Sequence, residues 1–479
     1  MPKKESNGDK SPSDWAELTR NDLDSIYRTL TENHPGPVDT ENSWFSEHLS
    51  TGFEPAKQNA AKAKNYDDYE AVLALYVNGF NDGHLGVRFN AQRRDIPWTG
   101  FLIAKRGSEY VVAESEDKAP KVGWTLQSCD GITAMEIMTN YVLPLKRGSP
   151  ASQADLFRRA PWILQGNSNL WRPKFSTCVF DSGGKSINFA LKYRNIDESE
   201  LSTRINAVNK DSTRKFSIEN LDKKTIWVNL PSFHPEQDQV KDLQDLIADM
   251  HDHRNARYVV FDVRGNTGGS SVWGRDVLVS LYGEGFSELL NRNDAIDASY
   301  AEWRVSPGNL AYLEKILPMF KERHGEMSDG YKEFDQTLKS MREATKAGKT
   351  FARQGGNETM TQTTSTKSSP KLLPSAKAIL LTDGYCGSAC LDFMDMALLL
   401  PNVVHVGGST GADTLYMDIR SEKLPSGLAE LSFAQKVYRK RRRGHNIGYD
   451  PSTVWLGSFS DTSRIKEWVK REVIPKLGN

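Results

Sequence analysis

The stretch Tyr258-Val-Val-Phe-Asp-Val-Arg-Gly-Asn-Thr-Gly-Gly-Ser-Ser271 begins as an almost wholly apolar run and ends in a glycine-rich turn. A short apolar run bounded by such a turn is typical of a buried strand. Further strands are predicted around it at 226–230, 376–382 and 403–406, with helices at 239–251 and 388–400. Apolar strands that alternate with amphipathic helices predict an α/β core with a largely parallel sheet covered on both faces.

The chain before this core divides into three regions of different pattern. Residues 1–12 are polar and without apolar period, which predicts a disordered tail. Residues 13–84 show apolar residues at helical spacing, interrupted at His34-Pro-Gly-Pro37, and end in Asn81-Asp-Gly-His84. This pattern predicts an N-terminal helical region.

Residues 85–215 read as short strands with glycine or charged breaks, including a turn at Asp130-Gly131, and predict a separate β-rich domain. The core then extends over 216–479. It is interrupted at 284–370 by a charged, helical insertion that ends in a low-complexity stretch. A long insertion between two strands of a site predicts a lid.

The composition limits the possible partners. Sixty-two basic residues balance sixty-two acidic residues among 479, so the chain has no overall attraction for nucleic acid or an anionic membrane. The sequence contains no run of about eighteen apolar residues, so no membrane-spanning helix is predicted. Four cysteines leave the compartment open: cytoplasmic as written, or periplasmic or secreted if a signal peptide was removed. An oligomer is possible.

Ser388 is the predicted nucleophile. It lies in Asp383-Gly-Tyr-Cys-Gly-Ser-Ala-Cys390, where a predicted strand enters a helix and small neighbours allow a carbonyl group to approach. The competing interpretation is a helix N-cap, a common role for serine. For Cys386 and Cys390 apolar packing is favoured, a thiolate nucleophile remains open, and too few ligands are near for a metal site.

Two other segments complete a candidate site. The glycines of Arg264-Gly-Asn-Thr-Gly-Gly269 allow backbone N–H groups to face an anion, which favours an oxyanion hole over a phosphate loop, because the lysine of a nucleotide loop is missing. His84 lies among glycine and polar residues at a junction between regions. His405 is expected in the core, and Arg439-Lys-Arg-Arg-Arg443 on a solvated face.

Together these segments resemble the tail-specific, or C-terminal-processing, serine peptidases, in the branch of the tricorn core protease and the retinoid-binding-protein repeats. The resemblance lies in the order of Asp82-Gly83-His84, Asp262-Val-Arg-Gly-Asn-Thr-Gly-Gly269 and Ser388-Ala389. It covers most of the chain from about residue 15, apart from the insertion. It implies a Clp-protease/crotonase-like catalytic core, a β-rich domain of peptide-binding or tricorn type, a peptide or protein substrate, and no cofactor or metal.

The resemblance also implies roles for single residues. Ser388 would attack the scissile carbonyl, and the Ala389 N–H with Gly268 or Gly269 would hold the oxyanion. The lysine of a Ser-Lys dyad would fall in Gly411-Ala-Asp-Thr414, which has none, so His84 becomes the expected base.

The acid that orients His84 is left unassigned by the resemblance. The sequence has Gly83 where the tricorn-type tetrad has a serine, and His445-Asn-Ile-Gly448 where it has a glutamate. The candidates for the acid are Asp413, Asp418 and Asp450, with Asp82 a weaker one.

The leading hypothesis is a serine peptidase that acts through an acyl-enzyme. A second is a catalytically weak or inactive member of the same fold that binds peptides or other ligands, suggested by the missing lysine and acid. A third, acyl-CoA chemistry on the same core, is disfavoured because no adenine or pantetheine site is evident.

Overall fold

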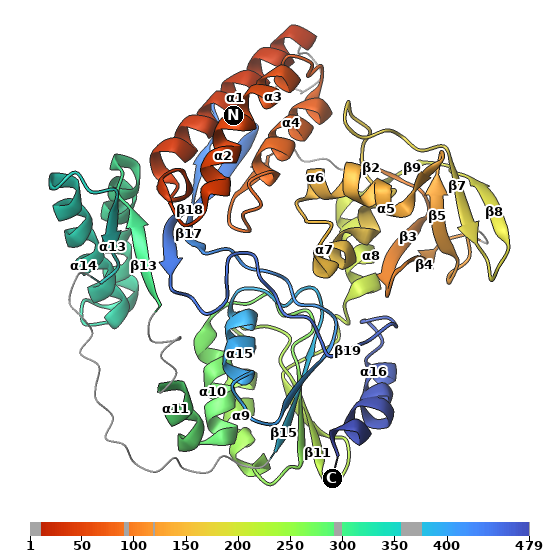
Figure 1. Ribbon diagram of the computed structural model, residues 1–479, viewed down its shortest axis with the longest axis vertical. Helices are drawn as coiled ribbons and strands as arrows, with labels where there is room; N and C mark the ends of the chain where they lie inside the picture. Colours follow the sequence, from red (N-terminus) through yellow and green to blue (C-terminus); the bar gives the residue numbers. More distant parts are fainter. Residues whose placement is uncertain (1–10, 91–94, 118–119, 292–298, 356–375, 479) are drawn as a thin grey trace.

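The computed structural model describes residues 11–90, 95–117, 120–291, 299–355 and 376–478. Most of the predicted tail and the low-complexity stretch at 357–370 lie outside these ranges. Within them the chain forms a helical N-terminal region, a β-rich domain, a helical hairpin and a mixed α/β core (Figure 1). No helix in these ranges has the length and apolar character needed to cross a membrane.

The core contains one six-stranded sheet, in which all neighbouring strands are parallel except the first pair. In spatial order the strands are β10 (Ser217–Asn220), β11 (Thr225–Asn229), β12 (Tyr258–Asp262), β15 (Lys377–Thr382), β16 (Val403–Gly407) and β19 (Thr453–Val454). The core helices are α9 (Val240–Asp249), α10 (Ser271–Tyr282), α15 (Ala389–Ala397) and α16 (Thr462–Trp468). The predicted α/β class is confirmed, and β19 is a strand that the sequence pattern missed.

Successive residues of the central strands pack on opposite faces of this sheet, as the pleat requires. Val228, Phe261 and Leu380 join the apolar cluster under α9, α10 and α15. Trp227, Val260 and Leu381 join the cluster under α16 on the other face. Both faces are therefore buried, which explains why these strands are continuous apolar runs instead of alternating ones.

The N-terminal region is confirmed as helical and packs on a second sheet. Its helices are α1 (Pro12–Asn33), α2 (Ser43–Thr51), α3 (Phe53–Ala60) and α4 (Tyr66–Asn78). The sheet contains β1 (Gly86–Phe89), β13 (Tyr300–Arg304), β14 (Phe351–Arg353), β17 (Tyr416–Lys423) and β18 (Ala429–Arg439). Strand β18 pairs with β1 near its start, with β13 near its end and with β17 along most of its length, so this sheet joins segments from both sides of the predicted boundary at 216.

The β-rich domain contains helices as well as strands. Its strands are β2 (Asp95–Trp98), β3 (Phe101–Arg106), β4 (Glu109–Ser115), β5 (Thr125–Cys129), β6 (Ile132–Thr133), β7 (Thr177–Asp181), β8 (Ser186–Ala190) and β9 (Arg194–Asp197). Its helices are α5 (Ala134–Ile137), α6 (Leu143–Lys146), α7 (Gln153–Arg159) and α8 (Glu198–Asn209). Asp130 and Gly131 both have positive φ, 48° and 82°, which confirms the predicted turn between β5 and β6.

The described part of the insertion is anchored to the rest of the chain. It contains α11 (Glu284–Asn291), α13 (Pro307–His324) and α14 (Asp329–Lys346), besides β13 and β14. At the start of α13, Ser306 Oγ donates to Asn33 Oδ1 at 2.8 Å, and Asn309 Nδ2 donates to the Asn33 carbonyl at 2.8 Å. Strand β13 pairs with β18. These contacts fix the hairpin beside α1, so its described part does not have the loose attachment expected of a lid.

Candidate active site

Ser388 lies between β15 and α15 in a backbone conformation that serine rarely adopts. Its φ is 52° and its ψ −125°, although it is not glycine. Such conformations cost on the order of 1–3 kcal/mol and are kept where the surrounding structure enforces them. Ser388 is the N-cap of α15, but its side chain makes no capping hydrogen bond. The competing interpretation of an ordinary N-cap therefore does not fit, because the hydroxyl is not used by the helix.

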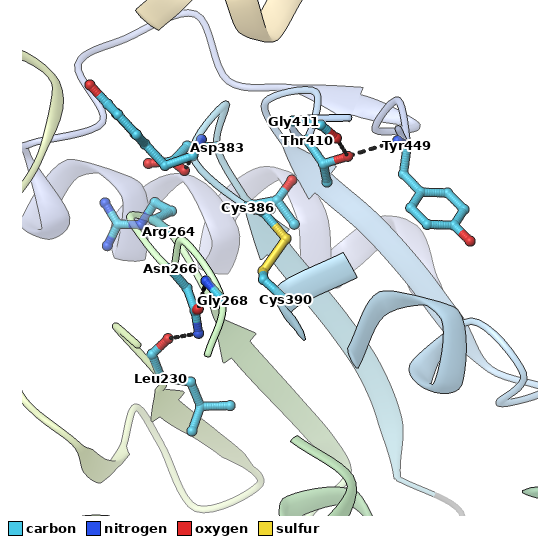
Figure 2. The surroundings of a disulfide bond; sticks show 12 residues. Leu230, Arg264, Asn266, Gly268, Asp383, Cys386, Cys390, Thr410, Gly411 and Tyr449 are labelled. Atoms are coloured by element: carbon cyan, nitrogen blue, oxygen red, sulfur yellow. Dashed lines mark hydrogen bonds between the residues drawn. A yellow bond between two sulfur atoms is a disulfide. The ribbon is translucent and has the colours of Figure 1, made fainter. Parts of the chain in front are cut away.

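A disulfide between Cys386 and Cys390 brackets this serine (Figure 2). Both cysteines are fully buried. Since a disulfide sulfur is neither a thiolate nor a thiol, the open alternative of a cysteine nucleophile is wrong for this oxidised form. The expectation of plain apolar packing is also corrected, because the two sulfurs are covalently joined. The second pair, Cys129 and Cys178, links β5 to β7 in the β-rich domain.

The glycine-rich turn after β12 packs directly against Ser388. A Cβ atom built on Gly268 would lie 2.7 Å from the Ser388 Cβ and 3.0 Å from the Ala389 nitrogen. The side chain of Asn266 holds this turn in place. Its Nδ2 donates to the Leu230 carbonyl at 3.0 Å, and its Oδ1 accepts from the Gly268 N–H at 2.9 Å (Figure 2). The approach therefore requires glycine at position 268.

The same contacts distinguish between Gly268 and Gly269, the two glycines predicted as oxyanion donors. The Gly268 N–H is already donated to Asn266, which argues against Gly268 as a donor. Gly269 lies opposite Phe233, but the two hydrogen bonds there use atoms of the residues on either side of it. Gly268 O accepts from Phe233 N, and Ser270 N donates to Phe233 O. Within the described ranges, no hydrogen bond uses the N–H of Gly269 or of Ala389.

Buried charges tie the two turns together. The Asp383 carboxylate accepts from Gly265 N at 3.0 Å and from Tyr385 N at 2.9 Å, so it joins the glycine turn to the Ser388 turn. Burial raises the pKa of Asp383, and the two N–H bonds and nearby arginines oppose that effect. Arg264 forms two hydrogen bonds to Asp262, at 2.8 and 2.6 Å. No role was predicted for these residues from the sequence.

The pKa of Asp262 is shifted in the opposite direction. Burial would raise this pKa, but the Arg214 and Arg264 guanidinium groups and the hydrogen bonds from Arg264 hold it below its ordinary value. The shortest ion-pair contact is 3.0 Å to Arg214 and 2.6 Å to Arg264. Asp262 is therefore a buried anion that depends on two cations.

His84 is held by backbone groups. Its Nδ1 lies 2.6 Å from the carbonyl oxygen of Tyr416, and its N–H donates to Asp82 Oδ1 at 2.8 Å. Because a carbonyl oxygen can only accept, Nδ1 carries the proton and the neutral ring has a free lone pair on Nε2. Asp82 is buried against His34, whose Nε2 lies 3.1 Å from Asp82 Oδ2. Neither Tyr416 nor His34 was predicted from the sequence as part of the site.

None of the predicted orienting acids is hydrogen-bonded to the His84 ring. Asp413 lies 3.5 Å from Arg441 and 3.7 Å from Arg443, Asp418 pairs with Lys436 at 2.5 Å, and Asp450 accepts from Ser409 Oγ at 2.6 Å. Asp82, the weaker candidate, contacts the backbone of His84 and not its ring. The position expected for an acid is taken by the Tyr416 carbonyl oxygen.

The prediction that the basic run at 439–443 forms a solvated face is wrong. Instead of forming a solvated face, Arg439 and Arg443 are buried. Arg439 pairs with Asp39 at 2.6 Å and Arg443 with Asp395 at 2.6 Å. His405 is buried as expected, with its Nε2 2.7 Å from Thr382 Oγ1. Within the described ranges, no group of three His, Cys, Asp or Glu side chains is placed to hold a metal ion.

Ser388 and His84 line one cavity of about 510 Å³, which is the structural basis of the site. Residues 147–159 of the β-rich domain and 409–413 and 446–450 of the core form its other walls. No described residue of the insertion lines it. Two of the acid candidates, Asp413 and Asp450, line the cavity, and Asp418 does not. A serine and a histidine in one cavity, with unused N–H groups beside the serine, is an arrangement found in serine hydrolases.

Residues 224–453 match the model of peptidase family S41. This segment belongs to that family of serine peptidases, which confirms the resemblance found in the motifs. The fold of the chain is similar to that of mature CPAF, with a TM-score of 0.63 at 14% identity, over 96% of this chain and 98% of that one. Mature CPAF complexed with lactacystin gives 0.62 at 14% identity, over 96% and 99%. No curated protein has a matching sequence.

Proposed function

We propose that this peptidase cleaves peptide bonds through an acyl-enzyme on Ser388, with His84 as the general base. The observation that carries the proposal is the conformation of Ser388: a non-glycine residue with φ of 52°, no capping bond, and a place in the same cavity as His84. A strained serine whose hydroxyl is not used by its own helix is what a nucleophile at a turn requires.

In this proposal His84 Nε2 takes the proton of Ser388 Oγ as Oγ bonds to the scissile carbonyl carbon. The carbonyl oxygen becomes an oxyanion and accepts from the N–H groups of Gly269 and Ala389. When the C–N bond breaks, His84 gives its proton to the leaving amine. Water then attacks the ester by the same route in reverse, releasing the second product and restoring Ser388.

The Tyr416 carbonyl supports the role of His84. By accepting from Nδ1–H, it selects the neutral tautomer with Nε2 free to receive a proton. Unlike a carboxylate, a carbonyl carries no full charge to stabilise the imidazolium that forms next. We therefore expect a slower acylation step than in an enzyme with an acid at that place. The six-stranded, mostly parallel sheet also supports a Clp-protease/crotonase-like core.

A fluorophosphonate probe tests the nucleophile directly, because it labels an activated serine. Wild type should be labelled and should hydrolyse a peptide pool, and Ser388→Ala should do neither. Ser421→Ala is the matched control, since Ser421 lies in β17 and its hydroxyl forms a hydrogen bond with Ser432 across the sheet. Equal labelling of wild type and Ser388→Ala would refute the assignment. Lactacystin, named with CPAF, provides a second probe for the same comparison.

The second candidate is a member of the fold that binds peptides and turns them over weakly or not at all. The observation that favours it is the lack of a carboxylate on the His84 ring within the described residues. Peptide binding that persists without Ser388-dependent cleavage would support this candidate. Any cleavage that Ser388→Ala abolishes would rule out an inactive protein.

A further inference from the structure

A second cavity, of about 100 Å³, lies between the N-terminal helices and the β-rich domain. Its walls come from α4, α6, β2, the start of α8 and residues 162–172. Helices α4 and α6 are in contact, and Asn78 Nδ2 of α4 donates to the Pro144 carbonyl of α6 at 2.9 Å (Figure 1). No described residue lines both this cavity and the one that contains Ser388. The proposed reaction therefore makes no use of it.

Two basic side chains line this cavity without a carboxylate partner. Lys146 lies over the ring of Trp162, with its Nζ 4.3 Å from the ring centroid. Arg172 is buried, and its Nη2 donates to the Trp162 carbonyl at 2.8 Å. Among the residues that the structure describes, neither Lys146 nor Arg172 forms an ion pair with an acid. Both groups are therefore held beside Trp162 and lack an anion.

The pKa values of both groups reflect this lack. Burial lowers the pKa of Lys146, and the charge of Glu70 opposes this effect while that of Arg172 adds to it. Burial also lowers the pKa of Arg172, to about 10, so its side chain stays charged at neutral pH. A carboxylate bound beside the two side chains stabilises their charged forms.

Carboxylates line the same cavity from other elements. Glu70 belongs to α4, and Glu198 is the first residue of α8. The charge of Glu198 acts on Lys146, yet the two side chains form no ion pair. Within the described ranges, the Glu198 carboxylate also accepts no hydrogen bond. The cavity thus presents basic groups and a carboxylate that do not neutralise one another by direct contact.

A small molecule that carries both charges fits this arrangement. An α-amino acid has a carboxylate for Lys146 and Arg172 and an ammonium group for Glu198. A guanidinium group also matches a carboxylate in geometry, through parallel N–H bonds. Because a cavity of about 150 Å³ holds a benzene molecule, this smaller cavity suits an amino acid with a small side chain, such as glycine or alanine.

The cavity is connected to the segment that carries His84. Lys146 ends α6, and Arg147 is the next residue. Arg147 Nη1 donates to the carbonyl of Asp82 at 3.3 Å and to that of Leu85 at 2.9 Å. Since these two carbonyls lie on either side of His84, a change in the position of α6 reaches the proposed base directly.

We propose that this cavity is a binding site for a small α-amino acid, which acts on the peptidase through α6. The carboxylate of the amino acid contacts Lys146 and Arg172, and its ammonium group contacts Glu198. A bound amino acid restrains Lys146 and, through the next residue of the chain, the segment that holds His84. The site goes beyond the proposed function, because binding needs no catalytic group.

Titration of the Ser388→Ala chain tests binding without cleavage. Glycine, acetate and methylammonium are compared by ligand-observed NMR at constant ionic strength. Acetate and methylammonium each carry only one of the two charges, and neither is larger than glycine. We expect glycine to bind at least about tenfold more tightly than either, as one more charged hydrogen bond gives. Equal affinity for all three, or no saturable binding of glycine, overturns the proposal.

Substitutions in the Ser388→Ala chain then locate the bound glycine. Lys146→Met and Glu198→Gln should each weaken glycine binding about tenfold. Glu200→Gln is the matched control, because Glu200 is in the same helix, pairs with Arg204 and does not line the cavity. If Lys146→Met does not fold, the exposed Glu198 decides alone. Unchanged glycine affinity in Glu198→Gln overturns the proposal.

Hydrogen exchange tests the connection to His84. At about ten times the Kd of glycine, amide exchange at residues 81–86 of the Ser388→Ala chain should slow several-fold. Exchange in β8 serves as the reference and should not change. The added Glu198→Gln substitution should remove the effect. Unchanged exchange at 81–86 while glycine is bound overturns the action through α6.

This proposal and the catalytic one fail separately. If Ser388 is not labelled or needed for cleavage, glycine binding and its effect on residues 81–86 are still measurable, because neither uses catalysis. If glycine does not bind but cleavage depends on Ser388, the amino-acid site fails and the catalytic proposal stands.

Discussion

The Nδ1 atom of His84 lies 2.6 Å from the carbonyl oxygen of Tyr416, so the ring is oriented by the backbone of β17 and not by an acid. A backbone group cannot be removed by substitution of its side chain and does not titrate. The consequence is that the tautomer of the neutral ring does not depend on the ionisation of another side chain. The strength of His84 as a base therefore depends on where β17 places the carbonyl group of Tyr416.

Because no acid orients the ring, we predict that replacing an acid does not lower activity as much as replacing His84 does. His84→Ala should lower kcat/KM by at least about 10³-fold, as removal of a catalytic base does. Asp418→Asn and Asp450→Asn should each change it by less than about tenfold, because neither acid contacts the ring. Steady-state hydrolysis of one peptide by the three variants provides the measurement. A thousandfold loss in either asparagine variant would identify an acid and contradict the backbone role.

The close approach of Gly268 to Ser388 predicts a position-specific effect of a single methyl group. Gly268→Ala adds a Cβ 2.7 Å from that of Ser388, at a φ of 104°. Gly265→Ala is the matched control, since its φ is 73° and nothing lies within 4 Å of its Cβ. Both variants should lose about 1–2 kcal/mol from backbone strain, measured by urea unfolding.

Only Gly268→Ala should also lose fluorophosphonate labelling, because only there must the nucleophile turn move. Equal labelling of the two alanine variants would mean that the contact between Gly268 and Ser388 does not hold the serine in place.

The buried anion Asp262 predicts a pH-dependent contribution to stability. Its pKa in the folded chain is below its ordinary value of 3.8. The stabilisation is therefore present above pH 3.8 and is lost as the pH falls through the folded pKa. Asp262→Asn should lower the free energy of unfolding by about 3–5 kcal/mol at pH 7, because it leaves two buried guanidinium groups without their anion.

The difference between wild type and Asp262→Asn should shrink as the pH falls below 3.8, measured by urea unfolding between pH 7 and the lowest pH at which both fold. Asp245→Asn is the control, because Asp245 forms an exposed pair with Lys241 and should change stability by less than about 1 kcal/mol. A difference that is constant with pH would contradict the assigned pKa shift.

The sequence predicted those parts of the fold whose signals are local. Tyr258–Asp262 is a strand because its residues are apolar on both faces, and His34-Pro-Gly-Pro37 ends α1 at Asn33, as proline requires. Ser388 was predicted from its turn of small residues, and His84 was predicted as its base from the family resemblance and the missing lysine. The glycine turn was recognised, but the choice between Gly268 and Gly269 depends on Asn266, whose bonds no spacing reveals.

What the sequence could not supply are partners distant along the chain. Tyr416 is 332 positions from His84, and its contribution is a carbonyl group that every residue type carries. β1 was expected in the β-rich domain, yet it pairs with β18, because register between distant strands leaves no local signal. Arg439 and Arg443 were expected in solvent for the same reason: the acids that bury them lie elsewhere in the sequence.

The Cys386–Cys390 disulfide predicts that reduction affects the nucleophile before it affects the fold. The bond joins residues on either side of Ser388, four positions apart, so it restrains a single turn and encloses little of the chain. Cys386→Ala with Cys390→Ala should therefore reduce the rate of fluorophosphonate labelling several-fold while the free energy of unfolding changes by only about 1–3 kcal/mol.

Cys129→Ala with Cys178→Ala is the matched control: it removes the disulfide between β5 and β7 and should leave labelling unchanged. Labelling kinetics with and without dithiothreitol should reproduce the difference in the wild type. If both double variants label like the wild type, the strained conformation of Ser388 is maintained without the disulfide, by the Gly268 contact and the Asp383 hydrogen bonds alone.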